Sequence, residues 1–115
     1  MSLDISQFSG GDDRYEHVTK RLIYTEGVKY VADEAGAYWL IDAIASYQTR
    51  ELDERTRGFQ CWTLAVNRKE STAVLVCDDG DGNVAVTQAI EYTDFPDEEI
   101  KMYVANGTLM LPSEY

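Results

Sequence analysis

Histidine, cysteine and proline are scarce in this sequence, with one His, two Cys and two Pro among 115 residues. Two cysteines cannot build the set of bridges that stabilises a small disulfide-rich domain. No run of about 18 uncharged apolar residues is present, since Asp42 interrupts the longest apolar-rich stretch at 35–45, and no membrane-spanning helix is predicted. The first residues are polar and acidic where a signal peptide needs a basic start and an apolar segment, so we predict a cytoplasmic protein.

Basic residues are almost absent from the last part of the chain. The sequence carries 21 acids and 10 bases, a net charge of −11, and residues 70–115 hold ten acids with Lys101 as their only base. A field of one sign repels phosphate backbones and attracts basic surfaces, so direct binding to nucleic acid is not expected. Two interpretations stay open: an acidic surface that keeps the protein soluble, or a docking surface for a basic partner.

Side chains that commonly carry catalysis are equally scarce. The single His17 lies in a polar segment beside Glu16, where we expect a surface histidine. Cys61 and Cys77 fall in predicted strands without neighbouring positive charge, so we expect reduced, buried thiols rather than reactive thiolates. These residues do not predict a nucleophile with its base.

The remaining carboxylates do not match an acid–base pair. Asp33 and Glu34 are interpreted as a solvated pair, and Asp42 as part of a polar helix face. No phosphate-binding glycine motif is present. We therefore predict a protein that is not an enzyme, without catalytic residues and without a cofactor.

The stretch 78–83 resembles the start of a calcium-binding loop, with oxygen-bearing side chains among glycines. Counting from Asp79, however, Val84 stands at the sixth position, where Gly is required, and Ile90 at the twelfth, where Glu is required. No two Cys or His stand at zinc-ligand spacing. We predict a turn at 78–83 and no metal site.

What is present predicts a single α+β domain, with 44% hydrophobic residues by composition. Thr25 is a candidate N-cap for a helix from Glu26, which Gly36 ends or bends. A second helix follows from 37, where Ala37, Leu40, Ile41 and Ile44 share one apolar face. The charged stretch 50–57 is expected to be a connection.

Alternating patterns after residue 58 predict strands at 59–66, 72–77, 84–92, 100–105 and 108–111, the last two joined by an Asn-Gly turn. Consecutive strands with short links predict an antiparallel meander of about five strands, packed on the two N-terminal helices as a two-layer sandwich. If Val66 pairs with Thr72, Cys61 lies opposite Cys77. A short strand at 21–24 is expected at one edge, residues 1–14 are predicted to form a flexible arm, and 15–115 the domain.

Four phrases together resemble one family: YTEGVKY at 24–30, AGAYWLIDAIA at 35–45, YTDFP at 92–96 and LPSEY at 111–115. The combination is similar to DUF6876, an uncharacterised family of small bacterial and mobile-element proteins. The likeness extends over residues 8–115. The resemblance implies a single-domain protein and supplies no activity, substrate or site residue.

Two acidic connections are the candidate partner-binding residues. The first contains Asp78, Asp79 and Asp81, and the second contains Asp94, Asp97, Glu98 and Glu99. Phe95 in the second is a candidate apolar anchor, and Tyr92, Tyr103 and Tyr115 are further aromatics that suit either an interface or the core. Whether the two connections share one end of the sheet depends on strand order, which the sequence leaves open.

The function predicted from these features is a protein-binding module that engages a basic protein surface, with no catalytic activity. Its concrete form is an inhibitor, of the anti-CRISPR or anti-restriction type, that occupies a surface built for nucleic acid. The alternative is an accessory domain that forms a homodimer through an exposed sheet edge, with acidity serving solubility alone. Steep salt dependence is expected of the first and not of the second.

Overall fold

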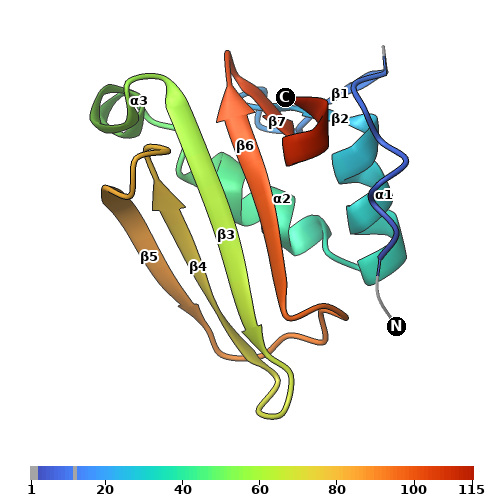
Figure 1. Ribbon diagram of the computed structural model, residues 1–115. Coiled ribbons are helices and arrows are strands. Elements are labelled where there is room, and N and C mark those ends of the chain that lie inside the picture. The colour runs from blue at the N-terminus through green and yellow to red at the C-terminus, as the bar shows by residue number, and fades with distance from the viewer. Residues whose placement is uncertain (1–2, 12) are drawn as a thin grey trace.

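The computed structural model describes residues 3–11 and 13–115 and has the predicted α+β architecture, with more elements than expected (Figure 1). The helical elements are α1 (Glu26–Ala35), α2 (Tyr38–Ser46), α3 (Arg50–Thr56) and a short 3-10 helix η1 (Pro112–Glu114). The strands are β1 (Arg14–Glu16), β2 (Ile23–Thr25), β3 (Phe59–Asn67), β4 (Thr72–Asp78), β5 (Val84–Ile90), β6 (Glu99–Ala105) and β7 (Thr108–Met110). Within this part of the chain, no helix has the length and apolar character needed to cross a membrane.

α1 begins and ends where the sequence predicts, and α2 begins one residue after the predicted start at 37. Thr25 caps α1 through its Oγ1, which accepts from the Val28 amide at 3.3 Å, and Gly36 ends the helix in a left-handed conformation at φ 61°. The apolar face of α2 is buried through Leu40, Ile41 and Ile44. Local capping and helical periodicity are therefore sufficient to define these two elements.

The third helix corrects the prediction of a charged connection at 50–57. Thr49 caps α3 by accepting from the Leu52 amide at 3.2 Å, and Leu52 and Thr56 are buried under the otherwise charged turns. Arg57 ends the helix in the left-handed region at φ 56°. Two residues one helical turn apart, Leu52 and Thr56, form the buried face of this helix. The sequence pattern did not indicate the helix because the surrounding residues are mostly charged.

The sheet has seven strands in the order β1-β2-β7-β6-β3-β4-β5, so the predicted five-stranded meander is wrong in number and order. The pair β2–β7 is parallel and the other pairs are antiparallel. β6 does not follow β5 in space but returns to the other side of β3. Alternate residues of β6 are buried, whereas β5 has no buried residue, and the strand with the stronger apolar face takes the inner place.

The predicted register between β3 and β4 is wrong by one residue. Asn67 belongs to β3 and pairs with Thr72, so Trp62 lies opposite Cys77 and Cys61 opposite Asp78. Asn67 stays in the strand because its Oδ1 accepts from the Glu70 amide at 3.1 Å and stabilises the turn that follows. The Asn-Gly turn between β6 and β7 is confirmed, with Ala105 paired to Thr108.

One face of the sheet packs on α1 and α2, and the other face is open (Figure 1). Trp62, Leu64 and Leu75 point into the core between the sheet and the helices and are each 1% exposed. Residues that alternate with them, such as Cys61 and Thr63, therefore point to the open face. This open face is the part of the fold on which the candidate site lies.

The C-terminal residues hold the start of α1. The Glu114 carboxylate accepts from Thr25 Oγ1 at 2.6 Å, from the Gly27 amide at 3.2 Å and from the Leu111 amide at 3.0 Å. A carboxylate at a helix N-terminus satisfies amides that have no partner within the helix and interacts favourably with the helix dipole. Glu114 thus connects the C-terminal segment to the start of α1.

The described part of the predicted N-terminal arm contacts the domain. Leu3, Ile5 and Phe8 are partly buried against the core, and the Phe8 and Tyr30 rings lie 5.0 Å apart. β1 begins at Arg14, one residue before the predicted boundary. The flexibility of segment 1–14 stays a prediction, and residues 1, 2 and 12 lie outside the described residues.

Candidate binding surface

The two acidic connections lie at opposite ends of the sheet. Residues 79–83 join β4 to β5 at one end, and residues 91–98 leave β5 at the other, because β5 runs antiparallel to β4 (Figure 1). Asp78, Asp79 and Asp81 are therefore separated from Asp94, Asp97, Glu98 and Glu99 by the length of β5. The seven acids form two sets and not one continuous face.

The second set surrounds a buried side chain. Phe95 is 3% exposed and belongs to the core, so it is not available as the anchor that the sequence suggested. Asp97 is partly buried, and its Oδ2 accepts from the Leu3 amide at 3.3 Å. Asp94, Glu98 and Glu99 are exposed. This end of the sheet offers charge without an exposed aromatic side chain from Phe95.

The first set belongs to an ordered turn. Asp78 Oδ1 accepts from the Gly80 amide at 2.7 Å, and Asp79 accepts from the Asp81 amide at 2.9 Å and from Asn83 Nδ2 at 2.8 Å. The hydrogen bond from the Asn83 side chain, helped by the Asp81 amide, holds the pKa of Asp79 below its usual value. Asp79 therefore shapes the turn, while Asp81 is exposed and its carboxylate accepts no hydrogen bond from the described residues.

A cavity of about 440 Å³ adjoins this turn on the open face of the sheet. Its floor is one row of paired residues across three strands, Tyr103 on β6, Cys61 on β3 and Asp78 on β4. The hollow exists because a small cysteine stands between two larger side chains in that row. The other lining residues are Phe59, Gly80, Gly82, Lys101 and Tyr115.

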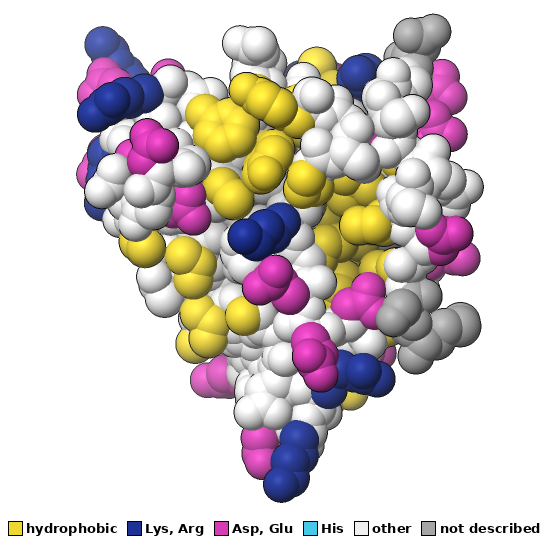
Figure 2. All heavy atoms as spheres, viewed as in Figure 1, with side chains coloured by type: hydrophobic (Ala, Val, Ile, Leu, Met, Phe, Trp, Pro, Cys, Tyr) yellow, Lys and Arg dark blue, Asp and Glu magenta, His cyan; other side chains and the backbone are white. Residues whose placement is uncertain are grey.

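Three aromatic side chains form one wall of the cavity. The ring centroids of Phe59 and Tyr103 are 5.1 Å apart, those of Phe59 and Tyr115 5.4 Å, and those of Tyr103 and Tyr115 5.6 Å. Tyr115 is 73% exposed although it belongs to this cluster. Figure 2 shows hydrophobic side chains gathered over the upper ends of β3 and β6, with acidic side chains to their left and a basic side chain below. We call Phe59, Tyr103 and Tyr115 the aromatic cluster.

Both cysteines are buried and unbridged, as the sequence predicts. Burial, with a smaller effect of the Asp78 charge, raises the pKa of the Cys61 thiol and raises the pKa of Cys77 to about 12. Both thiols therefore stay protonated at neutral pH. Cys61 contributes a small, uncharged floor to the cavity.

A comparison with protein families identifies the family of this chain. The model of a family of unknown function, DUF6876, matches residues 1–115. This chain belongs to DUF6876. No curated protein and no solved structure matches it.

The single histidine of this DUF6876 protein is not on the surface, which corrects the sequence-based expectation. His17 is 8% exposed, and its ring nitrogens contact Asp42 Oδ1 at 2.7 Å and Thr19 Oγ1 at 2.8 Å. The Asp42 side chain remains 68% exposed. The pair connects the turn before β2 to the middle of α2, and because the two residues are 25 positions apart in sequence, no local pattern predicts this contact.

Asp33 and Asp42 have separate partners and form no carboxylate pair. Asp33 accepts from Lys29 Nζ at 2.8 Å and from the Tyr38 hydroxyl. These hydrogen bonds, the one from Lys29 first, hold the pKa of Asp33 below its usual value. Asp33 is therefore an exposed carboxylate with its partners on α1 and α2.

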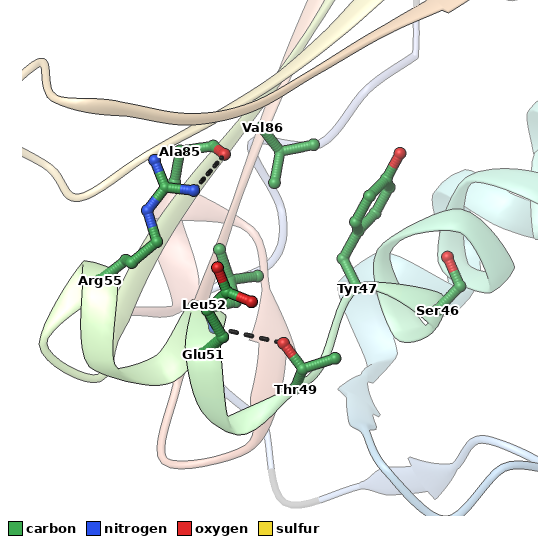
Figure 3. Close-up of a pocket in the computed structure, with 8 residues that line it drawn as sticks. All are labelled: Ser46, Tyr47, Thr49, Glu51, Leu52, Arg55, Ala85 and Val86. Atoms are coloured by element: carbon green, nitrogen blue, oxygen red, sulfur yellow. Dashed lines mark hydrogen bonds between the residues drawn. The ribbon is translucent and has the colours of Figure 1, made fainter.

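A second cavity of about 180 Å³ lies between α3 and β5 (Figure 3). Arg55 reaches across it, and its Nη1 donates to the Ala85 carbonyl at 3.2 Å. Tyr47 points toward β5 from the other side, and its hydroxyl donates to Gln88 Oε1 at 2.7 Å. These contacts attach α3 and the end of α2 to the edge strand β5. The polar side chains of this cavity therefore have a structural role.

Within residues 3–11 and 13–115, no three His, Cys, Asp or Glu side chains are placed to hold a metal ion together. The turn at 78–83 has its Asp78 and Asp79 oxygens engaged by backbone amides instead. The cavity beside that turn combines an aromatic wall with the Asp78 carboxylate. The sequence named its acids but missed its aromatic cluster, since Phe59 precedes Tyr103 by 44 positions.

Proposed function

We propose that this DUF6876 protein is a protein-binding module without catalytic activity, and that it engages a basic surface of a partner protein. The observation that carries the proposal is that the acidic side chains of the C-terminal half lack basic partners in the part of the chain that the structure describes. Of the ten acids in residues 70–115, none forms an ion pair with the described residues. No ion pair within residues 3–11 and 13–115 neutralises these charges, and those on exposed side chains such as Asp81, Glu98 and Glu99 are available to a partner.

The division of the acids into two sets narrows the contact surface. The turn with Asp78 and Asp81 adjoins a cavity walled by three aromatic side chains, whereas in residues 91–98, beside the other set, Tyr92 is the single exposed aromatic side chain, because Phe95 is buried. Binding energy at interfaces comes mainly from a few aromatic and arginine anchors, and rim charges chiefly direct association. The turn at 78–83, with its neighbouring cavity, is therefore the proposed centre of the interface.

The concrete form of this proposal is an inhibitor that occupies a surface its partner uses for nucleic acid. Lysine and arginine side chains placed to contact phosphates also attract spaced carboxylates. An anti-CRISPR or anti-restriction protein is the type of inhibitor that would work in this way. The partner then loses nucleic acid because the acidic protein takes the same cationic groups.

The test is capture of partners from an extract of the cells that encode this protein. Two variants are compared with the wild type, one with Asp78→Asn and Asp81→Asn and one with Glu98→Gln and Glu99→Gln. Asp79 is left unchanged because its carboxylate orders the turn through the Asp81 amide and the Asn83 side chain, and Asn at position 78 keeps an acceptor oxygen for the Gly80 amide. We expect the first variant to lose a partner that the second still retains, and the wild type to release it as the salt concentration rises.

The inhibitor form is tested on the captured partner itself. Adding the DUF6876 protein to the purified partner should displace labelled nucleic acid, and the Asp78→Asn, Asp81→Asn variant should displace less. Identical catches with all three proteins would overturn the proposed function. A partner that binds nucleic acid and this protein at the same time would overturn the inhibitor form alone.

A homodimer is the second candidate, and the edge strand β5 favours it. β5 is the last strand of the sheet, and its seven residues carry no charge, while β1 at the other edge has three residues, two of them charged. A long uncharged edge strand exposes backbone groups that can pair with another strand. A second copy could add its own β5 there, with acidity serving only solubility.

The homodimer is tested by measuring the molar mass in solution as protein concentration and salt are varied. Strand pairing should give twice the monomer mass with little dependence on salt. Thr87→Lys, at an exposed position of β5, should restore the monomer. A monomer at all concentrations would exclude this candidate.

A further inference from the structure

We infer that the cavity beside the turn at 78–83 is a receptor for an arginine side chain of the basic partner. This inference rests on the proposed function, because it names the group that the partner places at the interface. Three observations support it: the aromatic wall, the carboxylate at one side, and the small floor between them.

The aromatic cluster supplies a stacking surface. Phe59, Tyr103 and Tyr115 lie with their centroids 5.1–5.6 Å apart, and Tyr115 is 73% exposed. The negative face of an aromatic ring attracts a cation, and a planar guanidinium also stacks on it, which an ammonium cannot do. The wall therefore favours arginine over lysine.

Asp78 supplies the opposite charge at the right place. It stands in the same cross-strand row as Tyr103, with Cys61 between them. Neighbouring strands are about 4.8 Å apart, so the Asp78 and Tyr103 backbones are separated by roughly twice that distance. This spacing leaves room for a flat group between the ring and the carboxylate, above the small Cys61 side chain.

The turn fixes this arrangement before a partner arrives. The Gly80 amide holds Asp78 Oδ1 at 2.7 Å, which leaves its other oxygen free of hydrogen bonds from the described residues. A Cβ at Gly80 would lie 3.0 Å from two carbons of the Phe59 ring, so the turn lies directly against the aromatic cluster. A preformed site loses less conformational entropy on binding.

Lys101 sets the orientation of the bound group. It lines the cavity two residues before Tyr103 on β6 and pairs with Thr63, whereas Asp78 pairs with Cys61. The positive charge of Lys101 repels a guanidinium, so the arginine must lie toward Asp78 and the turn. Removing this charge should therefore strengthen binding of the arginine.

The experiment is a titration of the full chain with a short peptide of alternating arginine and glycine, followed by the NMR signals of the aromatic rings. A peptide of the same length with lysine in place of arginine is the comparison. We expect the arginine peptide to shift the signals of Phe59, Tyr103 and Tyr115 and to bind about fivefold or more tightly than the lysine peptide.

Variants of the lining residues separate this site from general attraction by charge. Tyr115→Ala and Asp78→Asn should each weaken the arginine peptide about fivefold, and Lys101→Gln should strengthen it. Tyr92→Ala is the matched control, because Tyr92 is also 73% exposed and does not line the cavity. Asp94→Asn is the control for charge at the other end of the sheet.

The outcomes distinguish the inference from the proposed function. Equal binding of the two peptides, equal effects of Tyr115→Ala and Tyr92→Ala, or no ring shifts would overturn the arginine site. If partner capture still depends on Asp78 and Asp81 in that case, the proposed function stands without it. If the peptide binds as expected while capture is insensitive to the acids, the receptor stands and the proposed function fails.

Discussion

Replacing Glu114 with Ala tests whether the C-terminal carboxylate holds the start of α1. The side chain accepts three hydrogen bonds, from Thr25 Oγ1 and from the amides of Gly27 and Leu111. Thr25 is 1% exposed, so after the substitution its hydroxyl proton is left without a partner and without ready access to water. Glu114 itself is partly exposed, so water can reach the two amides.

The expected loss of stability follows from these contacts. An unsatisfied buried hydroxyl costs about 1–3 kcal/mol, and loss of a negative charge at a helix N-terminus costs about 0.3–1 kcal/mol. Together they predict a loss of about 3 kcal/mol in the free energy of unfolding for Glu114→Ala, which lowers Tm by roughly 10 °C in a chain of this size. Glu114→Gln keeps an acceptor oxygen and should lose about 1 kcal/mol.

Urea unfolding followed by circular dichroism measures both variants. Glu98→Ala is the control, since its carboxylate is exposed and accepts no hydrogen bond from the described residues, and it should change stability by less than about 0.5 kcal/mol. A loss below about 1 kcal/mol for Glu114→Ala would refute the reasoning. So would a loss of equal size for Glu98→Ala.

Three further predictions concern the core and its edges. Gly27→Ala should destabilise the protein by about 1–3 kcal/mol in the same urea assay, because the new Cβ would lie 2.6 Å from Glu114 Oε1. This clash outweighs the preference of alanine over glycine in a helix, which is about 1 kcal/mol. A gain in stability would contradict the prediction. The raised pKa of Cys77, about 12 against 9.0, means that the unfolded chain loses the thiol proton first, so stability should fall by about 1 kcal/mol per pH unit from pH 9 upward. Cys77→Ala should not show this pH-dependent fall in the free energy of unfolding. If stability falls equally steeply with pH in the wild type and the variant, the prediction is wrong. His17→Ala should lose about 1–3 kcal/mol, because it removes a ring that is 8% exposed and leaves a cavity in its place. Asp42→Ala should lose less, because its side chain is 68% exposed and water can replace its contact with the ring nitrogen; the reverse order in thermal melts would overturn that assignment.

Much of the helical layer could be predicted from neighbouring residues alone. Thr25, Gly36 and the apolar face of α2 act within one or two turns of helix, so their effect is visible in sequence. α3 was missed because its buried face consists of Leu52 and Thr56 among charged residues. The register of β3 and β4 was missed because one hydrogen bond from Asn67 extends the strand by a residue, and a shift of one residue changes every pair.

The candidate site shows the same division. The acids Asp78, Asp79 and Asp81 and their turn were evident from composition, but the partition of the seven acids followed from the direction of β5. The aromatic wall depends on β6 pairing with β3, which brings Tyr103 beside Phe59 and Cys61. Pairing between distant strands is decided by which apolar faces bury best together, and short-range patterns do not record that choice.

The sequence by itself determined the α+β class, the first two helices, the buried thiols and the excess of negative charge, because each depends on composition or on residues close in the chain. Only the tertiary structure decided the strand order, the burial of His17 and Phe95, and the cavity between the aromatic cluster and Asp78. These depend on contacts across tens of residues, where the free energy of the whole core selects one arrangement among several that the local pattern allows.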